Sequence, residues 1–90
     1  MLDLTKYSLD DDDIIFLLEI EDACINGQNE IILEYKEKSF VLEPLGKAVQ
    51  VVEVAGKVVG KYESFDALLL DYRIDGKPLI ELIKELEYGD

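Results

Sequence analysis

The sequence predicts an α+β domain, in which a four-stranded, mainly antiparallel sheet of two hairpins carries an N-terminal helix and a C-terminal pair of helices. The hydrophobic period is helical near both ends of the chain and becomes two residues in the middle, where β-branched residues gather. Short polar or glycine-containing connections separate the strand-like runs. A length of 90 residues fits one compact acidic domain over residues 1–90. The expected order of elements is αββββαα.

The first helix is expected over residues 10–27, although the five consecutive apolar residues from Ile14 would also fit a buried strand. The flanking residues favour the helix. Asp10 is a suitable N-cap, and the aspartates that follow it lie in the first turn, where the helix dipole favours anions. At the other end, Gly27 can take the left-handed conformation that commonly closes a helix.

Two hairpins are expected next. Residues 30–43 alternate with a period of two around a short polar connection, and Pro44 should end the second strand because it lacks a hydrogen-bond donor. Residues 48–54 and 57–63 form the second hairpin around Ala55 and Gly56. Because the adjacent Val51 and Val52 interrupt the alternation, this strand is expected either to be covered on both faces or to carry a bulge.

Two helices are expected to close the chain. Ser64 is an N-cap for the first of them, and four apolar side chains then recur at helical spacing, which are Phe65, Leu68, Leu69 and Tyr72. After a turn over residues 73–77, Pro78 should open the last helix. Its buried side is expected to consist of Leu79, Leu82, Ile83 and Leu86.

The charge balance excludes several partners and locations. With 21 acidic and 9 basic residues, the net charge is −12, which repels phosphate backbones and anionic lipids. We therefore expect no direct contact with nucleic acid or membrane.

No apolar run approaches the roughly 20 residues that span a bilayer, and no secretory signal is visible at the N-terminus. Because a lone Cys24 cannot form an internal disulfide, a reducing, cytoplasmic location is expected.

Familiar enzyme chemistry lacks its usual residues. The chain has no histidine, which removes the Cys-His and Ser-His-Asp arrangements, and Cys24 lies near a predicted helix end among acidic residues that disfavour its thiolate. Four consecutive aspartates diverge around a helix and lack the spacing of a calcium loop. The glycines are isolated, so no phosphate-binding loop is present. We expect no enzyme activity, no cofactor and no metal site.

These exclusions favour a non-enzymatic protein-binding module, whose carboxylates would steer it to a basic partner as in an inhibitor or immunity-type protein. Two alternatives stay open: a nucleic-acid mimic that occupies a DNA- or RNA-binding protein, and a small enzyme or accessory subunit that uses carboxylates. The apolar run from Ile14 to Leu18 also suggests a homodimer, since one helical face cannot bury all of it. The residues expected to contact a partner are Asp10, Asp11, Asp12, Asp13, Phe16, Leu17 and Glu21.

Overall fold

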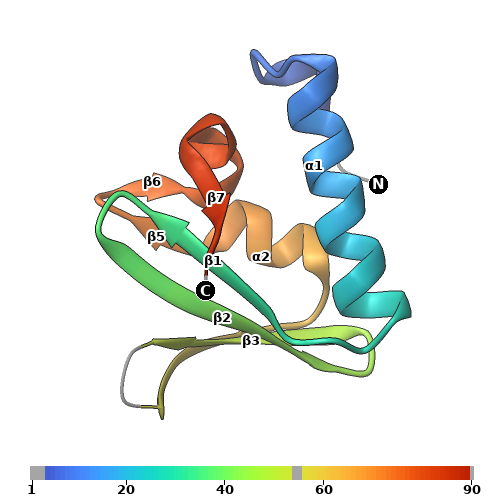
Figure 1. Cartoon of the computed structure of the whole chain (residues 1–90), viewed down its shortest axis with the longest axis vertical. Helices are drawn as coiled ribbons and strands as arrows, with labels where there is room; N and C mark the ends of the chain where they lie inside the picture. The colour runs from blue at the N-terminus through green and yellow to red at the C-terminus, as the bar shows by residue number, and fades with distance from the viewer. Residues whose placement is uncertain (1–3, 54–55, 90) are drawn as a thin grey trace.

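The computed structural model describes residues 4–53 and 56–89. Its helical segments are η1 (Leu4–Lys6), α1 (Asp11–Glu21), η2 (Asp22–Asn26), α2 (Phe65–Asp71) and η4 (Leu79–Glu85); η1 and η4 are 3-10 helices and η2 is a π-helical turn that continues α1. Its strands are β1 (Ile31–Tyr35), β2 (Lys38–Leu45), β3 (Ala48–Glu53), β4 (Lys57–Tyr62), β5 (Arg73–Ile74), β6 (Lys77–Pro78) and β7 (Leu86–Tyr88). The predicted α+β class with a mainly antiparallel sheet is confirmed (Figure 1).

The main sheet has five strands, in the order β4-β3-β2-β1-β7, and every neighbouring pair is antiparallel. Strands β1 to β4 form a continuous meander, and β7 returns from the far end of the chain to lie beside β1. Strands β5 and β6 form a separate two-stranded hairpin. The prediction of four strands in the order αββββαα was therefore wrong in strand number and in the order of the elements.

The error lies in the last segment, where a single helix was expected from Pro78. The side chains expected to be buried are buried, but the backbone forms a 3-10 helix and then the short strand β7. Leu86 pairs with Tyr35 and Tyr88 with Leu33, and the N–H of Gly89 donates to the carbonyl of Ile32 at 2.9 Å. Since buried residues three and four apart suit either conformation, the pairing with β1 decides between them.

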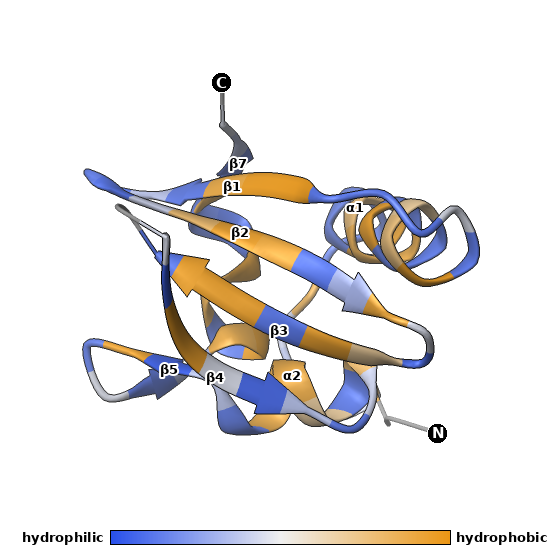
Figure 2. Ribbon diagram, turned by 90° about the horizontal axis from the view of Figure 1, so that it is seen from below, coloured by the Kyte–Doolittle hydropathy of each residue, from blue (hydrophilic) through white to orange (hydrophobic). Residues whose placement is uncertain are grey.

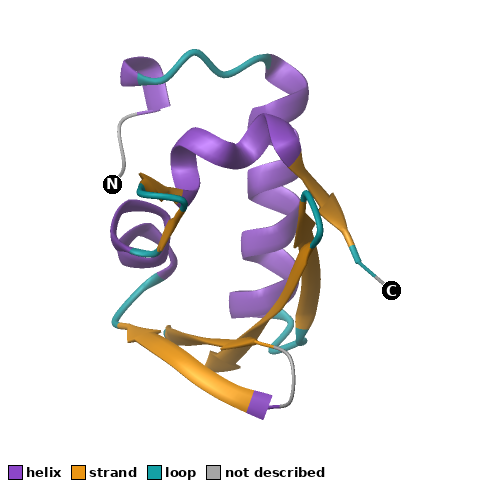
Figure 3. Cartoon of the chain, turned by 90° about the vertical axis from the view of Figure 1, so that its left-hand side faces the viewer, coloured by secondary structure: helices purple, strands orange, loops and turns teal. Residues whose placement is uncertain are grey.

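The helical segments cover one face of the sheet (Figure 3). Along β1, β2 and β3 the fully buried side chains all belong to that face, and they are Leu33, Tyr35, Phe40, Leu42, Val49 and Val51. The rest of the core comes from the helical segments and the residues beside them, namely Leu17, Ile20, Cys24, Phe65, Leu68, Leu69, Tyr72, Ile74, Leu79, Ile80, Leu82, Ile83 and Leu86. The opposite face of the sheet carries no layer of the described chain (Figure 2).

Helix α1 begins and ends by different means. Asp10 is the N-cap, as predicted, and its N–H donates to the Asp13 carboxylate at 3.0 Å. At the other end, Gly27 has a φ of −84° and does not take the expected left-handed conformation, which falls instead to Gln28 with a φ of 52°. Gly27 is required for space, because a Cβ there would lie 2.8 Å from the Ala23 carbonyl oxygen.

The strand ends also differ from the prediction. Pro44 lies inside β2 because it is beyond the last residue of β2 that pairs with β1, Leu42, so no hydrogen bond to β1 is lost. Gly46, with a φ of 68°, forms the tight turn into β3. For the strand with adjacent Val51 and Val52, the sequence left open burial on both faces or a bulge. The pairing with β4 does shift register between Val51 and Val52, but the extra residue is Val59, on β4. Residues 54 and 55, part of the predicted second turn, lie outside the described residues.

Two leucines on β2 test which face of the sheet is covered. Leu42→Ala should lower the free energy of unfolding by about 3 kcal/mol, because it empties a fully buried position. Leu45→Ala, on the opposite face and 47% exposed, should cost less than about 1 kcal/mol. Urea denaturation of both variants measures the difference; equal losses would contradict the one-sided arrangement.

Candidate protein-binding surfaces

The four aspartates at the start of α1 are not a free anionic cluster. Lys84, which comes from η4, places its Nζ 3.2 Å from Asp10 Oδ2 and 3.5 Å from Asp13 Oδ2, and the hydrogen bond to Asp10 is the main cause of the raised pKa of Lys84. Asp11 and Asp12 are exposed and take no part in this contact. The lysine thus joins the N-terminus of α1 to the C-terminal part of the fold.

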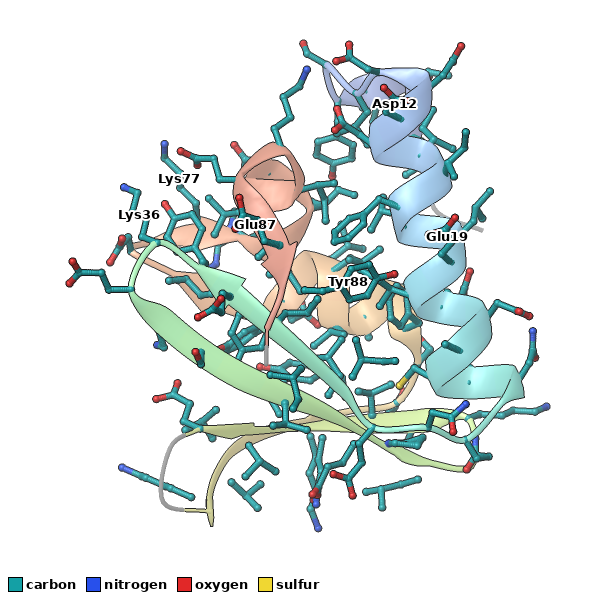
Figure 4. All side chains as sticks on the ribbon, in the orientation of Figure 1. Asp12, Glu19, Lys36, Lys77, Glu87 and Tyr88 are labelled. Atoms are coloured by element: carbon teal, nitrogen blue, oxygen red, sulfur yellow. The ribbon has the colours of Figure 1, made fainter. Side chains whose placement is uncertain are left out.

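The apolar residues expected to contact a partner lie inside the fold or against it. Leu17 is 4% exposed and belongs to the core, and the Phe16 ring packs edge-on against Tyr88 of β7 with centroids 5.1 Å apart (Figure 4). The exposed apolar residues of α1 are Ile15 at 52% and Leu18 at 55%. Helical spacing groups residues by face, but it does not say which face is buried. The sequence alone therefore could not separate the inward Phe16 and Leu17 from the exposed Ile15 and Leu18.

A groove between α1 and α2 brings two of the expected contact residues together with others that were missed. Its volume is about 130 Å³, and its lining consists of Leu4, Leu17, Leu18, Glu21, Phe65, Asp66 and Leu69. Glu21 is the last residue of α1 and Asp66 is near the start of α2, where Ser64 caps the helix as predicted by accepting from the Ala67 N–H at 3.0 Å. We call this site the α1–α2 groove.

The two acids of the groove differ from the aspartates at the helix start. Within residues 4–53 and 56–89, neither Glu21 nor Asp66 has a side-chain hydrogen bond or an ion pair. Partial burial, and then the nearby negative charge of Asp66, raise the pKa of the Glu21 carboxyl above its usual range. The groove therefore holds two carboxylates that no cation of residues 4–53 and 56–89 compensates.

The uncovered face of the sheet carries an apolar row that runs across four strands. Ile32 pairs with Val41, Val41 with Val52, and Val52 with Val58, so the register places these four residues in one row across the sheet. Ile32 is 38% exposed and Val58 46% exposed, while the two inner valines are half-buried. We call this row, with the polar residues that border it, the open face.

Acidic and polar residues border the apolar row. Glu34 and Glu87 pair across β1 and β7 on one side of the row, and Glu43, Gln50 and Lys61 pair in succession on the other. Among the described outward positions of the sheet, these carboxylates outnumber the single lysine. The open face is thus an apolar strip with a mainly negative border.

The edges of the sheet are protected against the addition of another strand. Strand β4 carries Lys57, Lys61 and a bulge, and β7 has only three residues, with Glu87 at its centre. Lysines, bulges and short length are the usual means by which proteins block edge pairing. The face of the sheet is consequently more available to a partner than its edges.

The carboxylates do not gather on one ridge. They occur at the start of α1, on the two borders of the open face, in the α1–α2 groove, on η4, at the end of α2 and in turns such as those at Glu37 and Asp75. Lys84 and Lys38 interrupt them by pairing with Asp10 and Glu53. A mimic of nucleic acid needs a continuous series of anions spaced like phosphates. This distribution gives that alternative no specific support.

Two other kinds of site were searched for in the described part of the chain. No three side chains of the metal-binding types come together there. No helix over the same residues is long and apolar enough to cross a bilayer.

A wider depression of about 390 Å³ lies between the N-terminal segment and η4, with Lys6, Tyr7 and Lys84 among its lining residues. Lys84 already pairs with aspartates, and the lining carries charges of both signs, Lys6 and Glu81, so this depression does not favour a ligand of one charge.

Comparison of the chain with protein-family models, with curated proteins and with solved structures found no match in any of the three.

The raised pKa of Glu21 predicts how this residue affects stability as pH changes. A carboxyl whose pKa is higher in the folded state than in the unfolded state binds its proton more tightly when folded, so its contribution to stability is present at acid pH and is lost as pH rises through the folded pKa. Glu21→Gln should therefore raise the free energy of unfolding at pH 7, by less than about 1 kcal/mol because solvent screens a half-exposed group, and should have no effect near pH 3.

Denaturation at several pH values measures this difference. Glu19→Gln, an exposed position on the same helix (Figure 4), is the control, since it removes the same charge away from the groove. A loss of stability in Glu21→Gln at neutral pH would show that the carboxylate is compensated and would contradict the description of the groove.

Proposed function

We propose that this protein is a non-enzymatic binding module that docks a basic protein partner on the open face of its sheet, in the manner of an inhibitor or immunity-type protein. The observation that carries the proposal is the apolar row from Ile32 to Val58, which is aligned across four strands and left without a covering layer. Contiguous apolar patches rimmed by polar residues are typical of protein interaction sites.

The chemistry of the border supports a basic partner. Interfaces commonly combine an apolar centre with a polar rim, and complementary charge on the rim raises the rate of encounter. Here Glu34, Glu43 and Glu87 lie around the apolar row. A net charge of −12 adds long-range repulsion between two copies and attraction for a positive partner. Self-association through the same face is the alternative occupant.

A cytoplasmic location and the absence of enzyme activity are parts of the same proposal. Cys24 is a free thiol and is fully buried, which suits a compartment that keeps thiols reduced. Burial raises the pKa of the Cys24 thiol, so the reactive thiolate is disfavoured. This cysteine is consequently assigned a packing role and not a nucleophilic one.

A variant of the open face tests the proposal. Ile32→Thr, Val52→Thr and Val58→Thr together remove the apolar row but keep β-branched side chains, so the sheet should fold. Ile15→Gln with Leu70→Gln, which removes exposed apolar surface from the helices instead, is the matched control. Affinity capture from a lysate of the source cells, followed by mass spectrometry, should find a basic protein retained by the wild type and the control and lost by the threonine variant.

Ionic strength and sedimentation complete the experiment. Capture should weaken between about 0.05 M and 0.3 M salt, because the border charges are solvent-exposed and screened. Retention of every captured protein by the threonine variant would contradict the proposal. If instead the purified wild type sediments as a dimer and the threonine variant as a monomer, the open face binds a second copy and not a basic protein.

A further inference from the structure

The α1–α2 groove is a second surface of the molecule, distinct from the open face. It lies in the helical layer, whereas the open face is on the other side of the sheet (Figures 2 and 3). Five apolar side chains make most of its lining, which are Leu4, Leu17, Leu18, Phe65 and Leu69. Among the described residues, Glu21 and Asp66 are the acidic groups of its lining. The groove is thus a small apolar recess with two carboxylates contributed by different helices.

The volume of the groove decides the size of its occupant. Pockets for metabolites and cofactors commonly enclose about 300 to 1,000 Å³, well above the 130 Å³ found here. A cavity of about 150 Å³ is known to take one benzene molecule. The side chains of lysine and arginine have a similar number of heavy atoms. The groove therefore fits one long side chain and not a whole small-molecule substrate.

The charges of the groove decide the chemistry of that side chain. Three other carboxylates form ion pairs with described lysines. Asp10 and Asp13 pair with Lys84, and Glu53 pairs with Lys38 at 3.0 Å. Glu21 and Asp66 have no such partner in the described chain, and their mutual repulsion contributes to the raised pKa of Glu21. A cation between them would remove this repulsion and regain an ion pair in a partly dehydrated site.

We propose that the α1–α2 groove binds a single basic side chain, arginine in preference to lysine, presented by a segment of another protein. The aliphatic part of that side chain lies against Leu17, Leu18 and Leu69, and its charged end lies between Glu21 and Asp66. Long basic side chains characteristically bury their methylene groups while the charged end stays near water. Arginine is favoured because its planar guanidinium can donate to two carboxylates at once.

Short blocked peptides test the groove without knowledge of the partner. The probe is an acetylated and amidated Gly-Arg-Gly peptide, and the matched peptides carry lysine or norleucine at the centre. Titration into protein labelled at its leucine methyl groups and its backbone amides should shift the methyl signals of Leu17, Leu18 and Leu69, with a dissociation constant of about 1 mM for the arginine peptide. The lysine peptide should bind more weakly and the norleucine peptide should not bind.

Variants of the two carboxylates test the charged part of the site. Glu21→Gln and Asp66→Asn should each weaken binding of the arginine peptide about tenfold, the loss expected when one charged hydrogen-bond partner is removed. Glu19→Gln should bind as the wild type does, since its carboxylate lies outside the groove. Amide spectra of the free variants check that each is folded. Because the test uses the groove alone, its result is independent of whether the open face binds a partner.

Three outcomes would overturn the proposal. Equal binding of the norleucine peptide would show an apolar recess without a role for the carboxylates. Shifts confined to the signals of Asp11 and Asp12, with the groove methyls unchanged, would show general attraction to the acidic helix start. No shift at peptide concentrations well above the millimolar range would show that no basic side chain binds.

Discussion

The structure depends on one constraint: one face of a five-stranded sheet must be covered by the few helical residues that a 90-residue chain contains besides its strands. A sheet needs a packed layer on at least one side, and α1, α2 and η4 together supply only that layer. Their inward residues, with those of the sheet, make a single continuous core. The open face follows directly from this shortage of helix, and so does the exposure of Ile15 on α1.

Local chemistry was sufficient to predict much of the fold. The caps at Asp10 and Ser64 lie where the sequence placed them, because each interaction forms within three residues along the chain. The two hairpins, β1 with β2 and β3 with β4, followed from alternation, whereas the pairing of β2 with β3 was not predicted. The interrupted alternation at Val51 and Val52 left a bulge as one of two alternatives, and the extra residue lies on β4. Gly27 was recognised as the end of the first helix but for the wrong reason, since close approach to the Ala23 carbonyl, and not a left-handed backbone, requires glycine there.

The larger misses depend on contacts between distant parts of the chain, whereas those at Gly27 and at the short β5–β6 hairpin are local. The spacing of Leu79, Leu82 and Ile83 predicts burial in either an α-helix or a 3-10 helix, and only the pairing of Leu86 with Tyr35 shows that a strand follows. The candidate site behaves in the same way. Glu21 was proposed as a contact residue from its charge alone, whereas its neighbour Asp66 belongs to another helix and no local pattern connects the two. The apolar row likewise requires the register of four strands, which alternation within one strand does not define.

The protected edges of the sheet have a consequence for how the protein behaves at high concentration. Runs of valine and isoleucine with an exposed face are the kind of segment that stacks into cross-β fibrils when a strand edge is available as a template. Here Lys57, Lys61 and the bulge disfavour stacking at one end of the sheet, and β7 offers only three residues at the other. The protein can therefore keep an exposed apolar sheet face without the growth of cross-β filaments that such a face would otherwise promote.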